Sequence, residues 1–247
     1  MTNRIALLAA LSLGLSVPLH AGEAEIDASI ADSHRSEENR ALDEGRKPAD
    51  VLAFADFQAG DVVADFMAGS GYYSELIANV VGKKGHVYAV EPDVFHDPAK
   101  WDVLRKSHHN VSVLLASPKA MQLAPNSVDA LFTHLNFHDL YWESEQYRFP
   151  RLDEKSVLRN WFAAVKPGGK VIIIDHAGPA GDPREVAGKL HRIDPAEVIK
   201  AMTAAGFVLD GRSDALHMAE DDHSKHVFDP AIRGKTDRFA LKFRKPE

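Results

Sequence analysis

The residues Asp61-Val-Val-Ala-Asp65-Phe-Met-Ala-Gly69-Ser-Gly71-Tyr-Tyr-Ser-Glu75 carry the strongest structural signal in this chain. An apolar run ends at a carboxylate, passes through a turn with two glycines and enters an amphipathic segment. The pattern predicts a buried strand, a tight turn and a helix. Glycines in such a turn let a ligand approach the backbone closely. Because α/β sheets bind nucleotide-like ligands at the carboxyl ends of their strands, the turn is a candidate ligand site.

The spacing around the two glycines separates two interpretations of the turn. A dinucleotide-binding fingerprint reads G-x-G-x-x-G or G-x-G-x-x-A, and Gly69 and Gly71 fit it, but Ser74 takes the third position. Asp65 ends the strand four residues before Gly69. Its carboxylate would repel the pyrophosphate of NAD but would suit a ligand with a cationic group. An NAD-linked oxidoreductase is therefore disfavoured.

Four further segments with strand character follow in order along the chain. Gly85–Pro92 is a short apolar strand that reaches an acid at Glu91. A third predicted strand, Val111–Ala116, ends just before Ser117. The remaining two are Pro125-Asn-Ser-Val-Asp129-Ala-Leu-Phe-Thr133, which leads into a fourth strand, and Val165-Lys-Pro-Gly-Gly169-Lys-Val-Ile-Ile-Ile-Asp175, which turns into a fifth.

Together the five segments resemble the class I S-adenosylmethionine-dependent methyltransferases over about residues 60–176. The first resembles that family's acid-x-G-x-G-x-G motif, the fourth its D-N-S-F-D segment and the fifth its L-K-P-G-G turn. The resemblance implies an α/β fold with a Rossmann-like doubly wound sheet of about seven strands, mostly parallel with an antiparallel last strand. It also implies S-adenosylmethionine as the cofactor and methyl transfer as the activity.

The resemblance assigns cofactor contacts to particular residues. Asp65 would help to hold the methionine part, and Glu91 would accept hydrogen bonds from both ribose hydroxyls, although an acid there could instead cap a helix. Met67 stands at the family's first glycine, and Ser117 stands where many relatives have an acid that contacts the adenine amine. The predicted cofactor-binding residues are Asp65, Met67, Ala68, Gly69, Ser70, Gly71, Tyr73, Glu91, Pro92, Ser117 and Asn136.

Polar residues gather after the fourth and fifth predicted strands, where loops overhang the crevice. His138 and Asp139 are the predicted catalytic pair, with His138 as the base that takes a proton from the methyl acceptor. Alternatively, these residues only hydrogen-bond their own loops. A metal site is the other alternative, but none is predicted, because two histidines four residues apart share a face only in a helix. Its ligand candidates would be His134, His138, Asp139, Asp175 and His176.

Composition narrows the class of protein and its partners. The chain has 247 residues, 45% hydrophobic and 26% charged, which is typical of a globular domain. The net charge is −7 and no basic stripe stands out, so a nucleic-acid partner is disfavoured and a small-molecule acceptor is predicted. The chain has no cysteine, which excludes disulfides and thiolate metal sites.

The amino terminus has the pattern of a secretory signal. Arg4 precedes the apolar run Ile5–Val17, and the small residue Ala21 follows. We expect cleavage after Ala21, with an uncleaved anchor as the alternative, and a periplasmic or secreted protein without a membrane span after cleavage. The predicted division is a signal peptide at 1–21, a flexible segment at 22–35 and one methyltransferase-like domain at 36–247.

The segment from about Ser36 to the end is closer still to exported bacterial proteins described only as predicted methyltransferases. Two hypotheses follow from the departures at Met67 and Ser117. The first is a small-molecule methyltransferase, and the second is a catalytically silent periplasmic ligand-binding protein on the same fold.

Hydrophobic periodicity predicts the remaining elements. A first helix is expected over Ser36–Phe57, broken or kinked at Pro48. Strict alternation in Arg238–Arg244 predicts a last strand, with Phe207–Gly211 as its partner. Further helices are expected at Tyr72–Val81, 97–107, Leu152–Val165 and from Asp194 to Ala205.

Overall fold

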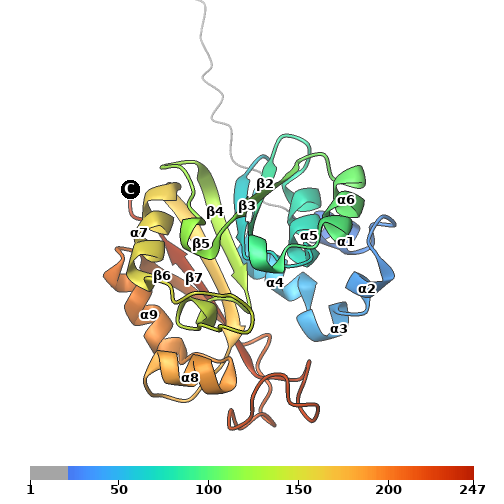
Figure 1. Ribbon diagram of the computed structural model, residues 1–247. Helices are drawn as coiled ribbons and strands as arrows, with labels where there is room; N and C mark the ends of the chain where they lie inside the picture. Colours follow the sequence, from blue (N-terminus) through green and yellow to red (C-terminus); the bar gives the residue numbers. More distant parts are fainter. Residues whose placement is uncertain (1–21) are drawn as a thin grey trace, which may run out of the picture.

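The computed structural model describes residues 22–247 as one twisted sheet with helices on both of its faces (Figure 1). The seven strands lie in the order β3-β2-β1-β4-β5-β7-β6. All neighbours are parallel except β7, which is antiparallel to both β5 and β6. The predicted fold class is therefore confirmed, including the antiparallel last strand. The predicted signal peptide, 1–21, lies outside the described residues.

The strands follow the predicted segments closely. The parallel part of the sheet contains β1 (Val62–Phe66), β2 (His86–Pro92), β3 (Val111–Ala116), β4 (Val128–His134) and β5 (Val165–His176). The antiparallel pair contains β6 (Val208–Ser213) and β7 (Arg238–Arg244).

The helices form two groups. One face of the sheet carries α1 (Glu23–Ile30), α2 (Glu37–Arg40), α3 (Asp43–Arg46), α4 (Pro48–Ala55), α5 (Tyr72–Val81) and α6 (Pro98–Ser107). The other side carries α7 (Glu154–Ala164), α8 (Pro183–Leu190) and α9 (Pro195–Ala204). Three short 3-10 turns, η1 (Asp93–Phe95), η2 (Pro118–Ala120) and η3 (His138–Leu140), follow strands β2, β3 and β4. None of the helices in residues 22–247 is long and apolar enough to cross a membrane.

Strand β5 shows why the sheet separates two hydrophobic cores. Successive side chains of a strand point to opposite faces. Val171 and Ile173 belong to the core beneath α7 and α9, whereas Ile172 and Ile174 belong to the core beneath α5. All four are fully buried, which explains why this strand is an unbroken apolar run rather than an alternating one.

The amino-terminal segment differs from its prediction. Residues 22–35 were expected to be flexible, but they contain α1, in which Ile26 is buried and Ser29 Oγ donates a hydrogen bond to the carbonyl of Leu76 at 2.9 Å. Arg35 is buried and forms ion pairs with Glu75 at 2.9 Å and with Asp43 at 2.6 Å. A buried guanidinium needs both partners, so this segment is fixed to α5.

The single helix expected over Ser36–Phe57 is also wrong, because the segment forms α2, α3 and α4. The Ser36 side chain caps α2 by accepting a hydrogen bond from Asn39 N at 3.1 Å. Lys47 has a φ of 44° and ends α3. Pro48 then occupies the first turn of α4, where its missing N–H costs nothing. The expected interruption at Pro48 is therefore a break, and Pro48 starts a new helix.

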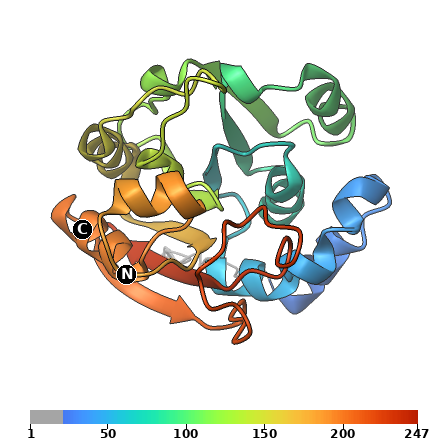
Figure 2. The ribbon, with the colours of Figure 1, turned by 60° about the horizontal axis from the view of Figure 1, so that its bottom comes forward.

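Residues 214–237 form a long connection before β7. Figure 2 shows it between α8 and the amino-terminal helices. Val227 N donates to the carbonyl of Leu190 at 3.1 Å on the α8 side. Its base is held by a buried ion pair of 2.9 Å between Arg192 and Asp221. Because both charges are paired and hydrogen-bonded, this connection can form a fixed wall.

Candidate functional site

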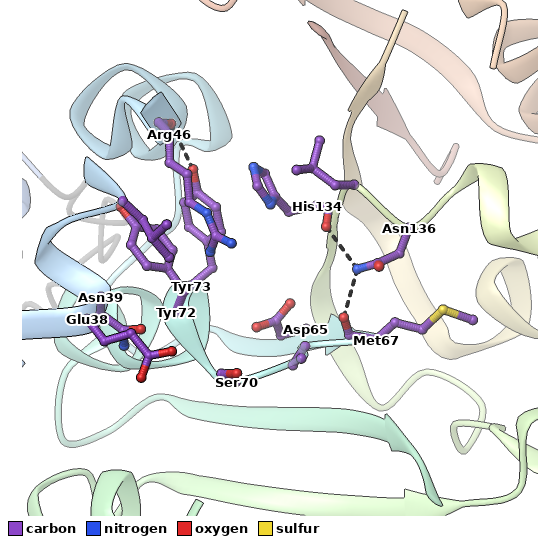
Figure 3. A pocket seen from close by; sticks show the side chains of 14 residues that line it. Glu38, Asn39, Arg46, Asp65, Met67, Ser70, Tyr72, Tyr73, His134 and Asn136 are labelled. Carbon is purple, nitrogen blue, oxygen red and sulfur yellow. Dashed lines mark hydrogen bonds between the residues drawn. The ribbon is translucent and has the colours of Figure 1, made fainter. Parts of the chain in front are cut away.

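The turn after β1 adopts an unusual backbone conformation. Met67, Gly69 and Gly71 all have positive φ, at 55°, 63° and 77°. A side chain costs about 1 kcal/mol or more in this left-handed region, so Met67 is strained where a glycine would not be. A Cβ on Gly71 would lie only 2.6 Å from Leu104 Cδ1, so that position requires glycine. Figure 3 shows the Met67 side chain directed away from Asp65, so it does not fill the space beside that acid.

A cavity of about 210 Å³ opens over this turn (Figure 3). Its wall has three sources: the turn itself with the start of α5, helices α2 and α3, and the end of β4. The lining residues are Glu38, Asn39, Leu42, Arg46, Asp65, Met67, Ala68, Gly69, Ser70, Tyr72, Tyr73, His134, Leu135 and Asn136.

Asp65 is the buried acid of this cavity and is only 3% exposed, whereas Glu38, the other acid in the lining, is exposed and paired with Lys100. Its Oδ2 accepts a hydrogen bond of 2.6 Å from Ser74 Oγ. Burial raises the pKa of Asp65 to about 7, even though that hydrogen bond and Arg46 favour the ionised form. A cationic ligand group beside Asp65 would favour the carboxylate. Ser74, which breaks the dinucleotide pattern, thus has a role in holding this acid.

Arg46 is the base of the same cavity and was not among the site residues predicted from the sequence. Figure 3 places Arg46 and Asp65 on different sides of the cavity. The guanidinium lies 4.3 Å from the centre of the Tyr72 ring, and no acid within residues 22–247 forms a salt bridge with it. A buried acid and a base on different sides of a small cavity complement a zwitterion such as an amino-acid group.

Glu91 lies beneath the turn and not in the cavity wall. Its Oε1 accepts a hydrogen bond of 2.6 Å from Gly69 N. Its Oε2 is buried and has no hydrogen-bond partner among the described residues. Burial, reinforced by the charge of Asp65, raises the pKa of Glu91 to about 8. An unpaired buried acceptor is costly, which marks Oε2 as a position for a ligand hydroxyl.

The predicted cofactor residues fall into two groups in the structure. Asp65, Met67, Ala68, Gly69, Ser70, Tyr73 and Asn136 line the cavity. Gly71 packs against Trp101 and Leu104 behind the turn, and the lining does not include Glu91, Pro92 or the exposed Ser117.

A second cavity, of about 400 Å³, adjoins the first. The two share Leu135 and Asn136 in their walls. Asn136 Nδ2 donates to the carbonyls of Met67 and His134, both at 2.8 Å, and so ties the loop after β4 to the turn after β1. The second cavity is lined by Phe95, Leu135, Asn136, His138, Asp139, Trp142, Tyr147, His176, His191, Val227 and Phe228.

His138 is the most strongly connected polar side chain of the second cavity. Its Nδ1 lies 2.8 Å from Asp175 Oδ1 and its Nε2 lies 3.4 Å from Asp139 Oδ1. Burial lowers the pKa of His138, but the two carboxylates outweigh burial and raise it to about 9. Burial raises the pKa of Asp139 to about 6 despite the nearby imidazolium. At neutral pH the pair is therefore an imidazolium beside a carboxylate.

Three side chains of the second cavity have the geometry to hold a divalent cation. The ligand atoms of His138, Asp139 and His191 lie within 4.8 Å of one another. Of the five ligand candidates considered from the sequence, only His138 and Asp139 belong to this group. The Nδ1 atom of His176 is hydrogen-bonded to Thr236 at 2.8 Å, and the His134 ring lies against Tyr73 at 4.7 Å. His191, at the end of α8, was considered from the sequence only as a possible substrate contact and not as a metal ligand, because no local pattern places it beside His138.

Comparisons with known proteins agree with this architecture. Residues 64–173 match a family described as methyltransferase domain. A SAM-dependent methyltransferase from Aquifex aeolicus is 22% identical, with a TM-score of 0.57 over 90% of this chain and 98% of that one. An S-adenosylmethionine-dependent methyltransferase from Mesorhizobium loti is 14% identical, with a TM-score of 0.57 over 83% and 100%. An arsenic(III) S-adenosylmethionine methyltransferase from Chlamydomonas reinhardtii is 16% identical, with a TM-score of 0.54 over 90% and 73%.

The comparison with curated proteins finds none that matches this sequence. The matched segment is similar to a methyltransferase domain, and the solved structures share the fold, so both support a methyltransferase with S-adenosylmethionine as its cofactor. None of these comparisons identifies the acceptor of the methyl group. The second cavity, which adjoins the first, is the candidate site for it.

Proposed function

We propose that this protein transfers a methyl group from S-adenosylmethionine to a nucleophilic atom of a small-molecule acceptor. The observation that carries the proposal is the meeting of two cavities at Asn136. The first contains the charge pair Asp65 and Arg46, and the second contains the proton-transfer group His138 and Asp139. When bound, S-adenosylmethionine supplies a methyl group activated by its attachment to a sulfonium.

The residues of the first cavity fit this cofactor chemically. Asp65 would hold its ammonium group and Arg46 its carboxylate. Beneath the turn and outside the cavity lining, the unpaired Oε2 of Glu91 would accept hydrogen bonds from ribose hydroxyls, as the resemblance implies. The glycine backbone at Gly69 has no heavy atom within 4 Å of where a Cβ would stand, which leaves room above the turn.

In the second cavity the acceptor must lose a proton as it attacks the methyl carbon. The sequence predicts His138 as the base; in our proposal His138 is instead protonated, because the two carboxylates raise its pKa to about 9. Asp139 is the acceptor of that proton in our proposal, because its pKa of about 6 keeps it ionised at neutral pH. His138 then stabilises the negative charge that develops on the acceptor, while Asp175 fixes the ring. Alignment of the acceptor with the cofactor supplies the rest of the catalysis.

Calorimetric titration of residues 22–247 with S-adenosylmethionine and S-adenosylhomocysteine tests this function. We expect micromolar binding, about −8 kcal/mol, and its loss in Asp65→Asn. Asp210→Asn, an exposed acid on β6, is the matched control and should bind normally. No binding of either compound to the wild-type protein would overturn the function and favour the silent ligand-binding alternative. Normal binding to Asp65→Asn would show that the cofactor pocket is elsewhere.

We also propose that the protein is exported and is periplasmic or secreted. The support is the charged and apolar pattern of residues 1–21. Expression of the full chain in a bacterium, followed by mass spectrometry of the fractionated protein, checks it. A product in the periplasm that begins at Gly22 is the expected result, whereas an intact Met1 in the cytosol would contradict it.

A further inference from the structure

The exposed aromatic residues of this protein are gathered at one place. Within residues 22–247, the Phe, Tyr and Trp side chains that are exposed are Phe95 at 45%, Tyr147 at 52% and Phe228 at 57%. All three line the second cavity. Single exposed apolar residues are ordinary, but a cluster of large rings around one opening indicates a binding surface.

These rings come from three segments that are far apart in sequence. Phe95 ends η1 after β2, Tyr147 lies in the loop after η3, and Phe228 lies in the connection before β7. Phe95 and Tyr147 are 6.5 Å apart between ring centres, and Tyr147 lies 6.0 Å from Trp142. The series continues from Trp142 to His191 at 5.0 Å and from His191 to Phe228 at 5.5 Å. The mouth of the cavity is therefore a continuous aromatic wall.

The floor of the same cavity is polar and buried. His138 and Asp139 lie there, close to the boundary with the first cavity at Asn136. No lysine or arginine is among the residues that line the second cavity, and the charge of His138 is already paired with Asp175 and Asp139, so the cavity offers no free cation for a carboxylate or phosphate on the acceptor. A molecule that fits must be aromatic at one end and carry a proton-bearing nucleophile at the other.

We propose that the methyl acceptor is a planar aromatic compound with a hydroxyl group, a phenol or naphthol, whose ring lies among Phe95, Tyr147 and Phe228. This inference rests on the proposed function. The hydroxyl proton goes to Asp139, and the oxygen forms a bond with the methyl carbon. The bond from that carbon to sulfur breaks, and its electron pair stays on sulfur, which leaves a neutral thioether and an aryl methyl ether.

The test compares 2-naphthol with decahydro-2-naphthol, which has the same hydroxyl group and carbon skeleton without the aromatic rings. Each is titrated calorimetrically into residues 22–247, with and without saturating S-adenosylhomocysteine. We expect 2-naphthol to bind at least about tenfold more tightly. Phe95→Ala and Phe228→Ala should each weaken 2-naphthol about five- to tenfold and leave S-adenosylhomocysteine binding unchanged. Val208→Ala, an exposed apolar residue on β6, should change neither.

Three results would overturn the inference, and each has a distinct meaning. Equal binding of the two alcohols would remove the aromatic preference. Weaker S-adenosylhomocysteine binding in Phe228→Ala would assign the rings to the cofactor's adenine. Sedimentation with phosphatidylcholine–phosphatidylglycerol vesicles that is lost in Phe95→Ala would identify a membrane contact. If S-adenosylhomocysteine does not bind the wild-type protein but 2-naphthol does, the proposed function fails while the aromatic site stands.

Discussion

Asp175 holds His138 with both of its carboxylate oxygens: Oδ1 lies 2.8 Å from the ring Nδ1, and Oδ2 accepts a hydrogen bond of 2.7 Å from the backbone N of His138. Asp175 is fully buried at the end of β5, and its charge keeps the ring protonated. The ring orientation is thereby set by the sheet and not by the loop that carries His138. Nε2 is left to face Asp139 and the second cavity.

Replacing Asp175 by Asn should release this charge while keeping the shape of the side chain. We expect the pKa of His138 to fall from about 9 toward or below the free-imidazole value of about 6.5, because burial then dominates. Methyl transfer to an accepted substrate should fall about a hundredfold. Histidine NMR titration of the two proteins measures the first effect, with Asp210→Asn as the control. An unchanged His138 pKa would contradict the assigned pairing.

The pH dependence of methyl transfer separates the two possible bases. If Asp139 accepts the proton and His138 must be charged, the rate rises through about pH 6 and falls through about pH 9. Asp139→Asn should be much slower and should lose the lower limb. Steady-state rates measured from below about pH 6 to above about pH 9 give this pH dependence. A rate that instead rises through about pH 9 would restore neutral His138 as the base.

The Asp65 carboxylate favours cofactor binding but should lower the stability of the protein without its cofactor. In the unfolded chain its carboxyl ionises near pH 4, whereas in the fold its pKa is about 7. Between these values the folded protein binds more protons, so the free energy of unfolding falls as pH rises across this window. Asp65→Asn should therefore be more stable than wild type by about 2–4 kcal/mol near about pH 8 and similar to it near about pH 4.

Urea unfolding at the two pH values measures this difference. The same variant should fail to bind the cofactor, which separates a lost ligand from a lost fold. A destabilised Asp65→Asn protein near about pH 8 would show that the carboxylate has favourable partners when the cavity is empty, against the raised pKa.

Arg46 should contribute affinity for the carboxylate end of the cofactor. Arg46→Met keeps an unbranched apolar chain beside Tyr72 but removes the charge. We expect cofactor binding to weaken about 10- to 100-fold, as for a charged hydrogen-bonded pair of about 1.5–3 kcal/mol. Arg212→Met, at an exposed position on β6, should bind as wild type does in the same calorimetric titration. Equal affinities for the two variants would remove Arg46 from the site.

Sequence patterns correctly predicted the elements that are determined by residues close together in the chain. The turn from Asp65 to Gly71 joins a strand directly to a helix, so the chemistry of neighbouring residues sets it. Helix α9 begins where Asp194 was expected to start it, with its side chain accepting from Ala196 N. The central strand β5 could be predicted from its unbroken apolar run, because both of its faces are buried.

Features that depend on tertiary contacts were not predicted. His138 and Asp175 were both noted in the sequence, but nothing local pairs residues that are 37 positions apart. Arg46 reaches the first cavity because α3 ends at a left-handed Lys47, a conformation that helical periodicity does not reveal. Phe228 forms a wall of the second cavity only because the buried pair Arg192–Asp221 holds the connection that carries it.

Met67 offers a test of backbone strain at the site. It has a φ of 55°, a conformation that favours glycine, yet its side chain is buried in the core beneath α7. Met67→Ala and Met67→Gly both lose that side chain, at a cost of about 2 kcal/mol or more. Only glycine relieves the left-handed backbone, so Met67→Gly should be more stable than Met67→Ala by about 1 kcal/mol. Urea midpoints of the three proteins decide the order. A more stable Met67→Ala would mean that this turn carries no strain, and the methionine would then be retained for its packing alone.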